Sequence, residues 1–112
     1  MSTAVQQALA DLCSKGVLHG EDVADVLSVA PATVARWLRG EAVPDLPTRA
    51  AIGQIHFIVG RLTALFAADE VRHWLNDVQP ALKGARPVDL IRGGRTAEVL
   101  AAIDALDMRP TP

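Results

Sequence analysis

Prolines and glycines divide this chain into short segments, and no other feature of the sequence constrains the fold as much. Pro31, Pro47 and Pro87 each precede an apolar segment. The fixed φ of proline suits the first position of a helix, where its missing N–H breaks no hydrogen bond. Gly40 and Gly93 follow such segments, where helices commonly end. This punctuation predicts several short helices and one longer helix that begins at Pro47.

The residues between these marks favour helix over strand. Half of the chain is hydrophobic, but only 4% of it is aromatic, and Ala, Leu and Val dominate over the β-formers Ile, Phe and Tyr. The 112 residues are enough for one domain or two small interlocked subdomains. We therefore predict an all-α protein with six or seven helices and no β-strand of more than a few residues.

Charge, cysteine content and hydrophobicity argue against several classes of protein, including secreted and membrane proteins. The net charge of −2 is not a general signature of nucleic-acid binding. Cys13 is the single cysteine, which excludes an intramolecular disulfide and fits a reducing cytoplasm. There is no signal-peptide pattern, and no apolar run reaches the roughly 18 residues that a membrane-spanning helix needs. We expect a cytoplasmic protein that does not enter a membrane.

Residues 21–39 have the pattern of a helix-turn-helix. One helix is expected over 21–28 and a second, opened by a proline, over 32–39, with a turn of three to four residues between them. The segment resembles the helix-turn-helix of the Xre type. It departs from that type at Ser28, which replaces the usual turn glycine.

Three polar residues fall on the outer face of the second helix of this motif: Thr33, Arg36 and Arg39. Arginine can bind guanine through two hydrogen bonds or neutralise a phosphate, and threonine can do either more weakly. These residues are therefore candidates for contact with operator DNA. The alternative is that both arginines are ordinary solvated charges, which the four basic and six acidic groups of residues 1–52 favour.

The longest predicted helix runs from about residue 47 to residue 67. Its apolar residues lie on more than one side, so it must be buried on several sides. We expect it to touch the N-terminal helices, the C-terminal helices and a second copy of the chain. Excess apolar surface usually marks an interface, and we predict a homodimer to which Phe57, Ile58 or Leu65 contributes.

Residues 74–103 carry an ordered set of packing and turn-forming residues. A short amphipathic helix is followed by a proline-marked turn, a helix of one or two turns and a last helix that starts near Arg95. The set resembles the toxin-binding domain of the Xre/MbcA/ParS family of bacterial antitoxins. The matching residues are Trp74, Leu75, Pro80, Ala81, Leu82, Gly84, Arg86, Pro87, Asp89, Leu90, Ile91, Val99, Leu100 and Ile103.

This resemblance implies a function. Antitoxins of the family bind RES-domain toxins, which degrade NAD, and obstruct their active site. They form homodimers, and the toxin–antitoxin complex commonly represses its own operon. By this resemblance the chain is an antitoxin and not an enzyme, and it needs no cofactor or metal. The residues that would face the toxin are Arg86, Asp89, Arg92, Arg95, Met108, Arg109, Pro110, Thr111 and Pro112.

The predicted organisation has four parts. They are a helix-turn-helix subdomain at 1–46, a central helix at 47–67, a toxin-binding helical module at 68–106 and a tail at 107–112. The tail departs from the family, whose antitoxins usually extend with a Gly-containing, aromatic or aliphatic segment. We nevertheless expect residues 108–112 to be disordered in the free protein and ordered in the toxin complex, because the arginine at position 109 suits a pocket built for an anionic dinucleotide.

Two other functions are compatible with the sequence, which contains no Walker loop, nucleophile elbow, zinc-ligand pair or dinucleotide fingerprint. The first is a stand-alone DNA-binding regulator whose C-terminal module only dimerises it. Such a regulator would bind its own promoter tightly without a partner. The second is an adaptor or assembly protein that uses the same helical module with a different partner. Its main partner would then lack a RES domain.

Overall fold

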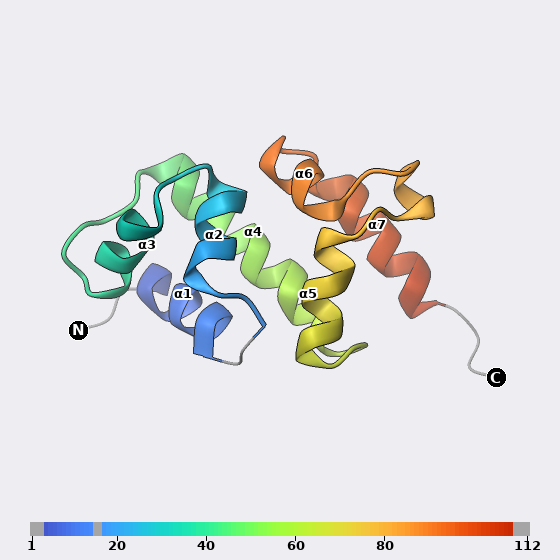
Figure 1. Ribbon diagram of the computed structural model, residues 1–112, viewed down its shortest axis with the longest axis horizontal. Helices are drawn as coiled ribbons and strands as arrows, with labels where there is room; N and C mark the ends of the chain where they lie inside the picture. The colour runs from blue at the N-terminus through green and yellow to red at the C-terminus, as the bar shows by residue number, and fades with distance from the viewer. Residues whose placement is uncertain (1–3, 15–16, 109–112) are drawn as a thin grey trace.

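Figure 1 shows a computed structural model of the chain, which describes residues 4–14 and 17–108. Within these residues there are seven α-helices, one 3₁₀ helix and no β-strand, so the all-α prediction is confirmed. The elements in chain order are α1 (Ala4–Ser14), α2 (Gly20–Leu27), α3 (Pro31–Leu38), α4 (Leu46–Thr63), α5 (Ala68–Asn76), η1 (Pro80–Leu82), α6 (Pro87–Arg92) and α7 (Thr96–Asp107).

Prolines open the helices where the sequence predicts it. Pro31 and Pro87 are the first residues of α3 and α6, and α4 has its proline in the first turn. Asp45 caps α4, because its Oδ1 accepts a hydrogen bond of 2.9 Å from the backbone N–H of Thr48. A cap of this kind satisfies one of the donors that a helix start leaves unpaired.

The predicted end of the long helix at residue 67 is wrong, because α4 stops at Thr63. The backbone N–H groups of Leu65 and Phe66 both turn back to the carbonyl of Leu62, at 2.9 and 2.8 Å. Ala67 then precedes α5, and its N–H donates to the carboxylate of Glu70 at 3.0 Å. The start signal of α5 therefore competes with continuation of α4, and the chain turns instead.

Helix α4 is the central element of the fold, and the predicted contacts with the N-terminal and the C-terminal helices of the same chain are confirmed. It packs against α1 and α2 in the N-terminal half and against α5 and α7 in the C-terminal half, and Figure 1 shows it running behind α2 and α5. One side of the helix is buried, and its members are Ile52, Ile55, Ile58, Val59 and Leu62. Each such side chain contributes roughly 1.5–3 kcal/mol by leaving water.

The buried residues form one hydrophobic cluster to which all seven α-helices and η1 contribute. The molecule measures 47 × 24 × 20 Å, with α1 and α3 at one end and α7 at the other (Figure 1). The core therefore runs the length of the molecule and does not divide between the two halves. The subdomain boundaries predicted after residues 46, 67 and 106 remain a prediction from the sequence.

Helices α2 and α3 and the turn at 28–30 form the predicted helix-turn-helix. Helix α2 ends at Leu27, one residue earlier than predicted, because Ser28 adopts the left-handed conformation with φ 58° and ψ 43°. The N–H of Val29 reaches the carbonyl of Ala24 at 2.9 Å. This is the hydrogen-bond pattern that glycine usually closes at the end of a helix, and here a serine closes it.

Candidate partner-binding surface

Helix α6 presents a network of charged side chains at the surface. The guanidinium group of Arg86 donates two hydrogen bonds of 2.9 Å to the carboxylate of Asp89. Arg92 donates to the same carboxylate at 3.1 Å. The hydrogen bond from Arg86 holds the pKa of the Asp89 carboxyl below its usual range. Three of the residues predicted to face a toxin therefore lie together at α6, two of them within this six-residue helix and Arg86 directly before it.

A groove of about 520 Å³ lies on the C-terminal side of this network. One wall is the loop around η1 and the other is α7, and Leu90 of α6 lies between them. The α7 wall is smooth, because three of its residues are alanines, and Arg95 and Glu98 stand at its start. The lining residues are Ala81, Leu82, Lys83, Ala85, Leu90, Arg95, Glu98, Ala101, Ala102 and Ala105.

The wall formed by η1 is held by a tight local structure. The N–H of Gln79 donates to the carbonyl of Ala85 at 3.0 Å, and the N–H of Gly84 donates to the carbonyl of Gln79 at 3.1 Å. Lys83 and Gly84 follow η1 in the left-handed region, at φ 58° and φ 82°. The side chain of Gln79 donates to the carbonyl of Trp74 at 3.0 Å, which fixes this loop to the end of α5.

Arg95 lies on the predicted surface directly before α7, and it pairs with a carboxylate in the first turn of that helix. Its side chain bonds to the carboxylate of Glu98 at 2.6–2.8 Å, one helical turn away. Met108 ends the described chain with 82% of its area exposed. Arg109, Pro110, Thr111 and Pro112 lie outside the described residues, so the structure does not test the predicted contacts of the tail.

The three residues predicted to read DNA differ in their surroundings. Arg36 is exposed on α3, whereas Thr33 is half-buried. Arg39 follows the helix, and its guanidinium group donates hydrogen bonds of 2.9 and 3.1 Å to the carboxylate of Glu41. Of the two arginines, Arg36 is therefore the better candidate for a phosphate or a base, since the charge of Arg39 is balanced beside it.

The structure corrects one of the three residues predicted at a dimer interface. Ile58 has no exposed area and lies in the core of a single chain, so it cannot contact a second copy in this conformation. Helical periodicity places it roughly 100° around α4 from Phe57, on the side that faces the core. Phe57 and Leu65 remain available, with 55% and 37% of their area exposed.

Phe57 lies in an apolar face that runs along α4. Its members are all exposed and follow one another at alternating spacings of four and three residues, the spacing of a helix that packs on another helix. They are Leu46, Ala50, Gly53, Phe57, Gly60 and Ala64. A methyl group added at either glycine would meet no atom within 4 Å. Packing within the chain therefore does not require these two glycines.

Neither a metal-binding cluster nor a membrane-spanning helix is found in the part of the chain that the structure describes. Within residues 4–14 and 17–108, no three His, Cys, Asp or Glu side chains lie close enough to hold a metal ion. In the same part of the chain, no helix is both long and apolar enough to cross a membrane. Burial raises the pKa of the Cys13 thiol, which keeps the reactive thiolate scarce at neutral pH.

Sequence reasoning missed the groove and the partner of Arg92. Half of the residues that line the groove are alanines, and an alanine in the sequence does not distinguish a concave surface from an ordinary helix face. The second carboxylate bound by Arg92 belongs to Asp25, at 2.8 Å and 67 residues away in the chain. The last turn of α2 contains no basic residue, which leaves the end of that helix without a favourable charge. This absence was the available indication that a basic residue from another part of the chain would bind there.

Comparison with known proteins agrees with this architecture. No family model matches the chain. Over 86 residues it is 30% identical to the mycobacterial cidal antitoxin MbcA of Mycobacterium bovis and of Mycobacterium tuberculosis. These aligned residues make up 77% of this chain and 76% of the relatives. A chain in the crystal structure of the M. tuberculosis MbcT–MbcA toxin–antitoxin complex has the same fold, with a TM-score of 0.81, 26% identity and coverage of 93% and 94% of the two chains. The resemblance found in the sequence is confirmed, and the chain belongs to the family of the antitoxin MbcA.

Proposed function

We propose that this protein is an antitoxin that neutralises a protein toxin by binding it directly. The observation that carries the proposal is the agreement in fold, over 93% of the chain, with a chain of a toxin–antitoxin complex. The surface of η1, α6 and α7 supports it, since it combines an apolar groove with a network of charged side chains. Binding of this kind needs shape and charge complementarity and no catalytic group.

Co-expression with the product of the neighbouring gene tests the proposal. The neighbour alone should arrest growth, and the present protein should restore it. Ala105→Trp places a large side chain in the groove from an exposed position on α7, and it should reduce toxin affinity at least tenfold. Ala97→Trp is the matched control, because Ala97 is exposed on the same helix but does not line the groove. Equal rescue by both variants would show that the toxin does not use the groove.

The toxin is further proposed to be a RES-domain protein that consumes NAD. This step is supported by the ordered residues from Trp74 to Ile103 that resemble the toxin-binding domain of the Xre/MbcA/ParS family. Cellular NAD should fall when the partner is expressed alone and recover when the present protein is added. A growth arrest without loss of NAD would exclude this class of toxin and leave the antitoxin proposal standing.

A second proposed activity is repression of the protein's own operon through the helix-turn-helix. The exposed position of Arg36 on α3 favours it, and the acidic balance of residues 1–52 favours binding only as a complex with the toxin. Arg36→Ala should weaken binding to the DNA upstream of the gene by roughly 1–3 kcal/mol. Arg39→Ala should have a smaller effect, because Glu41 already balances that charge. Equal losses would contradict this assignment.

A homodimer through α4 is the third part of the proposal. Each helical glycine costs about 1 kcal/mol relative to alanine, and Gly53 and Gly60 would let a second α4 approach closely on either side of Phe57. Phe57→Glu should therefore lower the mass measured by light scattering to that of a monomer. Gln54→Glu adds the same charge on the flank of this face and should leave the mass unchanged. A monomeric mass for the unmodified chain at high concentration would refute the dimer.

A further inference from the structure

The end of α2 receives its positive charge from another part of the chain. The last turn of α2 holds no basic residue, although the carbonyls at the end of a helix favour a nearby cation. Arg92 of α6 supplies one. Its Nε donates to the backbone carbonyl of Asp25 at 3.1 Å, and a terminal nitrogen donates to the Asp25 carboxylate at 2.8 Å. Arg92 therefore acts as a C-terminal cap for a helix 67 residues away.

This cap acts on the turn of the helix-turn-helix. The carbonyl of Asp25 that Arg92 binds also accepts the N–H of Ser28 at 3.2 Å, and Ser28 is the left-handed residue that ends α2. A left-handed conformation is unfavourable for serine, so its neighbours must hold it in place. The direction in which α3 leaves this turn therefore depends on a contact made by α6.

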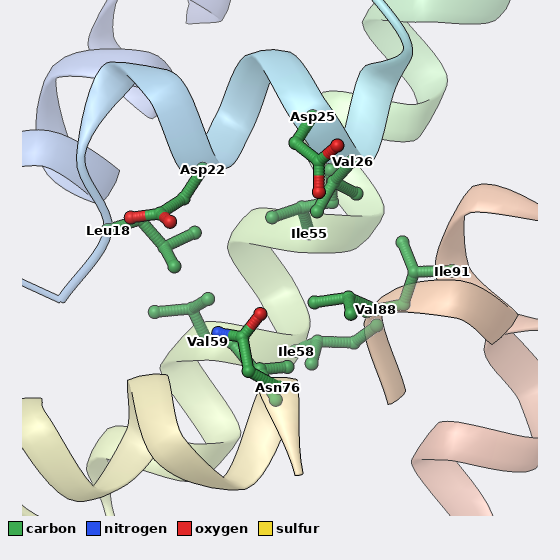
Figure 2. Close-up of a pocket in the computed structure, with 11 residues that line it drawn as sticks. Leu18, Asp22, Asp25, Val26, Ile55, Ile58, Val59, Asn76, Val88 and Ile91 are labelled. Carbon is green, nitrogen blue, oxygen red and sulfur yellow. The ribbon is translucent and has the colours of Figure 1, made fainter. Parts of the chain in front are cut away.

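A second ion pair joins α2 to the C-terminal helices. Asp22, one turn earlier in α2, lies 3.3 Å from the guanidinium group of Arg72 in α5. Figure 2 shows Asp22 and Asp25 at the edge of a small cavity between α2, α4, α5 and α6. Its volume of about 20 Å³ is room for no more than about one water molecule. The two ion pairs thus flank a place where packing beneath α2 is incomplete.

Arg92 divides its hydrogen bonds between two carboxylates. Besides Asp25 it binds Asp89 at 3.1 Å, and Asp89 is held in turn by Arg86. The Arg92 side chain is 33% exposed, whereas those of Arg86 and Asp89 are each 43% exposed. Asp89 is therefore open to a partner that approaches α6, and Arg92 lies between Asp89 and the helix-turn-helix.

We propose that Arg92 is a positioning residue that transmits partner binding at α6 to the turn before α3. A partner cation that pairs with Asp89 removes one of the two attractions on Arg92. Arg92 then binds Asp25 more strongly and tightens the turn at Ser28. The second half of this proposal rests on the proposed function, because it requires a partner that reaches Asp89.

Amide hydrogen exchange of the full-length ¹⁵N-labelled protein, without toxin or DNA, tests both halves. Arg92→Ala should accelerate exchange of the Ser28 and Val29 amides roughly five- to twentyfold, as expected for loss of a charged cap. Arg92→Lys should recover part of the protection, since lysine keeps the charge but not the fork of donors. Asp89→Asn imitates a neutralised Asp89 and should slow exchange at both amides about two- to threefold.

The controls separate positioning from general stabilisation. The Ile58 amide in α4 reports global unfolding, so its rate shows how much overall stability each variant loses. Arg95→Ala removes the ion pair between Arg95 and Glu98 at the start of α7, which stays intact when the turn at Ser28 opens locally, so this variant should leave the Ser28 rate unchanged. Acceleration of the Ser28 amide that is no greater in Arg92→Ala than in Arg95→Ala would overturn the positioning role, and an unchanged Ser28 rate in Asp89→Asn would overturn the link to α6. Because no toxin is used, neither result bears on the antitoxin function itself.

Discussion

Replacing Ser28 by glycine is predicted to stabilise the protein. Ser28 has φ 58° and ψ 43° and an exposed side chain, so its replacement removes a backbone penalty without opening a cavity. The left-handed conformation costs an L-residue roughly 1–2 kcal/mol. Glycine avoids this cost but loses about 0.5–1 kcal/mol through its greater freedom in the unfolded chain. The expected net gain is about 0.5–1 kcal/mol.

The gain can be measured as a shift in thermal unfolding. An unfolding entropy of about 2.1 cal/mol/K per residue over 112 residues converts 1 kcal/mol into roughly 4 °C. Circular dichroism at 222 nm should therefore show the transition of Ser28→Gly about 2–4 °C above that of the unmodified protein. The measurement is made at several concentrations, so that any effect of self-association is recognised.

Ser28→Ala is the control that isolates the backbone contribution. Alanine bears the same left-handed penalty as serine, so this variant should unfold within about 1 °C of the unmodified protein. The reasoning would be refuted if Ser28→Gly unfolded at the same temperature as Ser28→Ala or below it. In that case the left-handed backbone at Ser28 would carry no penalty that glycine relieves.

Three further predictions concern the core, the ion pairs and the thiol. Leu62→Ala removes a fully buried side chain from α4 and should lower the free energy of unfolding in urea by about 2–5 kcal/mol; a loss below about 1 kcal/mol would contradict its place in the core. Hydrogen bonds from Arg39 and Arg86 lower the pKa of Glu41 and Asp89, whose ordinary values are 4.5 and 3.8. Their stabilisation should be complete above these values and disappear as the pH falls through the lowered pKa values, so urea midpoints that stay constant from pH 6 to pH 2 would contradict it. The raised pKa of Cys13 predicts slower reaction with Ellman's reagent than that of a free cysteine at pH 8, and an equal rate would show that the thiol is not shielded.

Much of the helical framework could be predicted from local residues. Pro31 and Pro87 open helices because their fixed φ and missing N–H act at the position itself. The helix-turn-helix and the order of the C-terminal elements follow from similar local patterns. Such predictions succeed where the cause lies within a few residues of the effect.

The predictions that failed depend on contacts between distant segments. Ile58 looks like any other apolar residue of α4 in the sequence, and only the arrangement of the neighbouring helices shows that its side faces the core. The end of α4 at Thr63 lets α5 fold back and pack against it, a contact that the residues of α4 alone do not indicate. The pairing of Arg92 with Asp25 joins residues that no local pattern connects. The groove arises between two elements that are each unremarkable in composition.

The placement of α4 restricts how this protein can be recombined. Because the same helix supplies packing surface to α1 and α2 and to α5 and α7, a gene fusion that exchanges only one half would leave that half's side of α4 mismatched. Chimaeras with a new partner specificity should therefore be built by exchanging surface residues of α6 and α7 and keeping α4 intact. In this family, diversification by exchange of whole halves would require compensating changes along the shared helix.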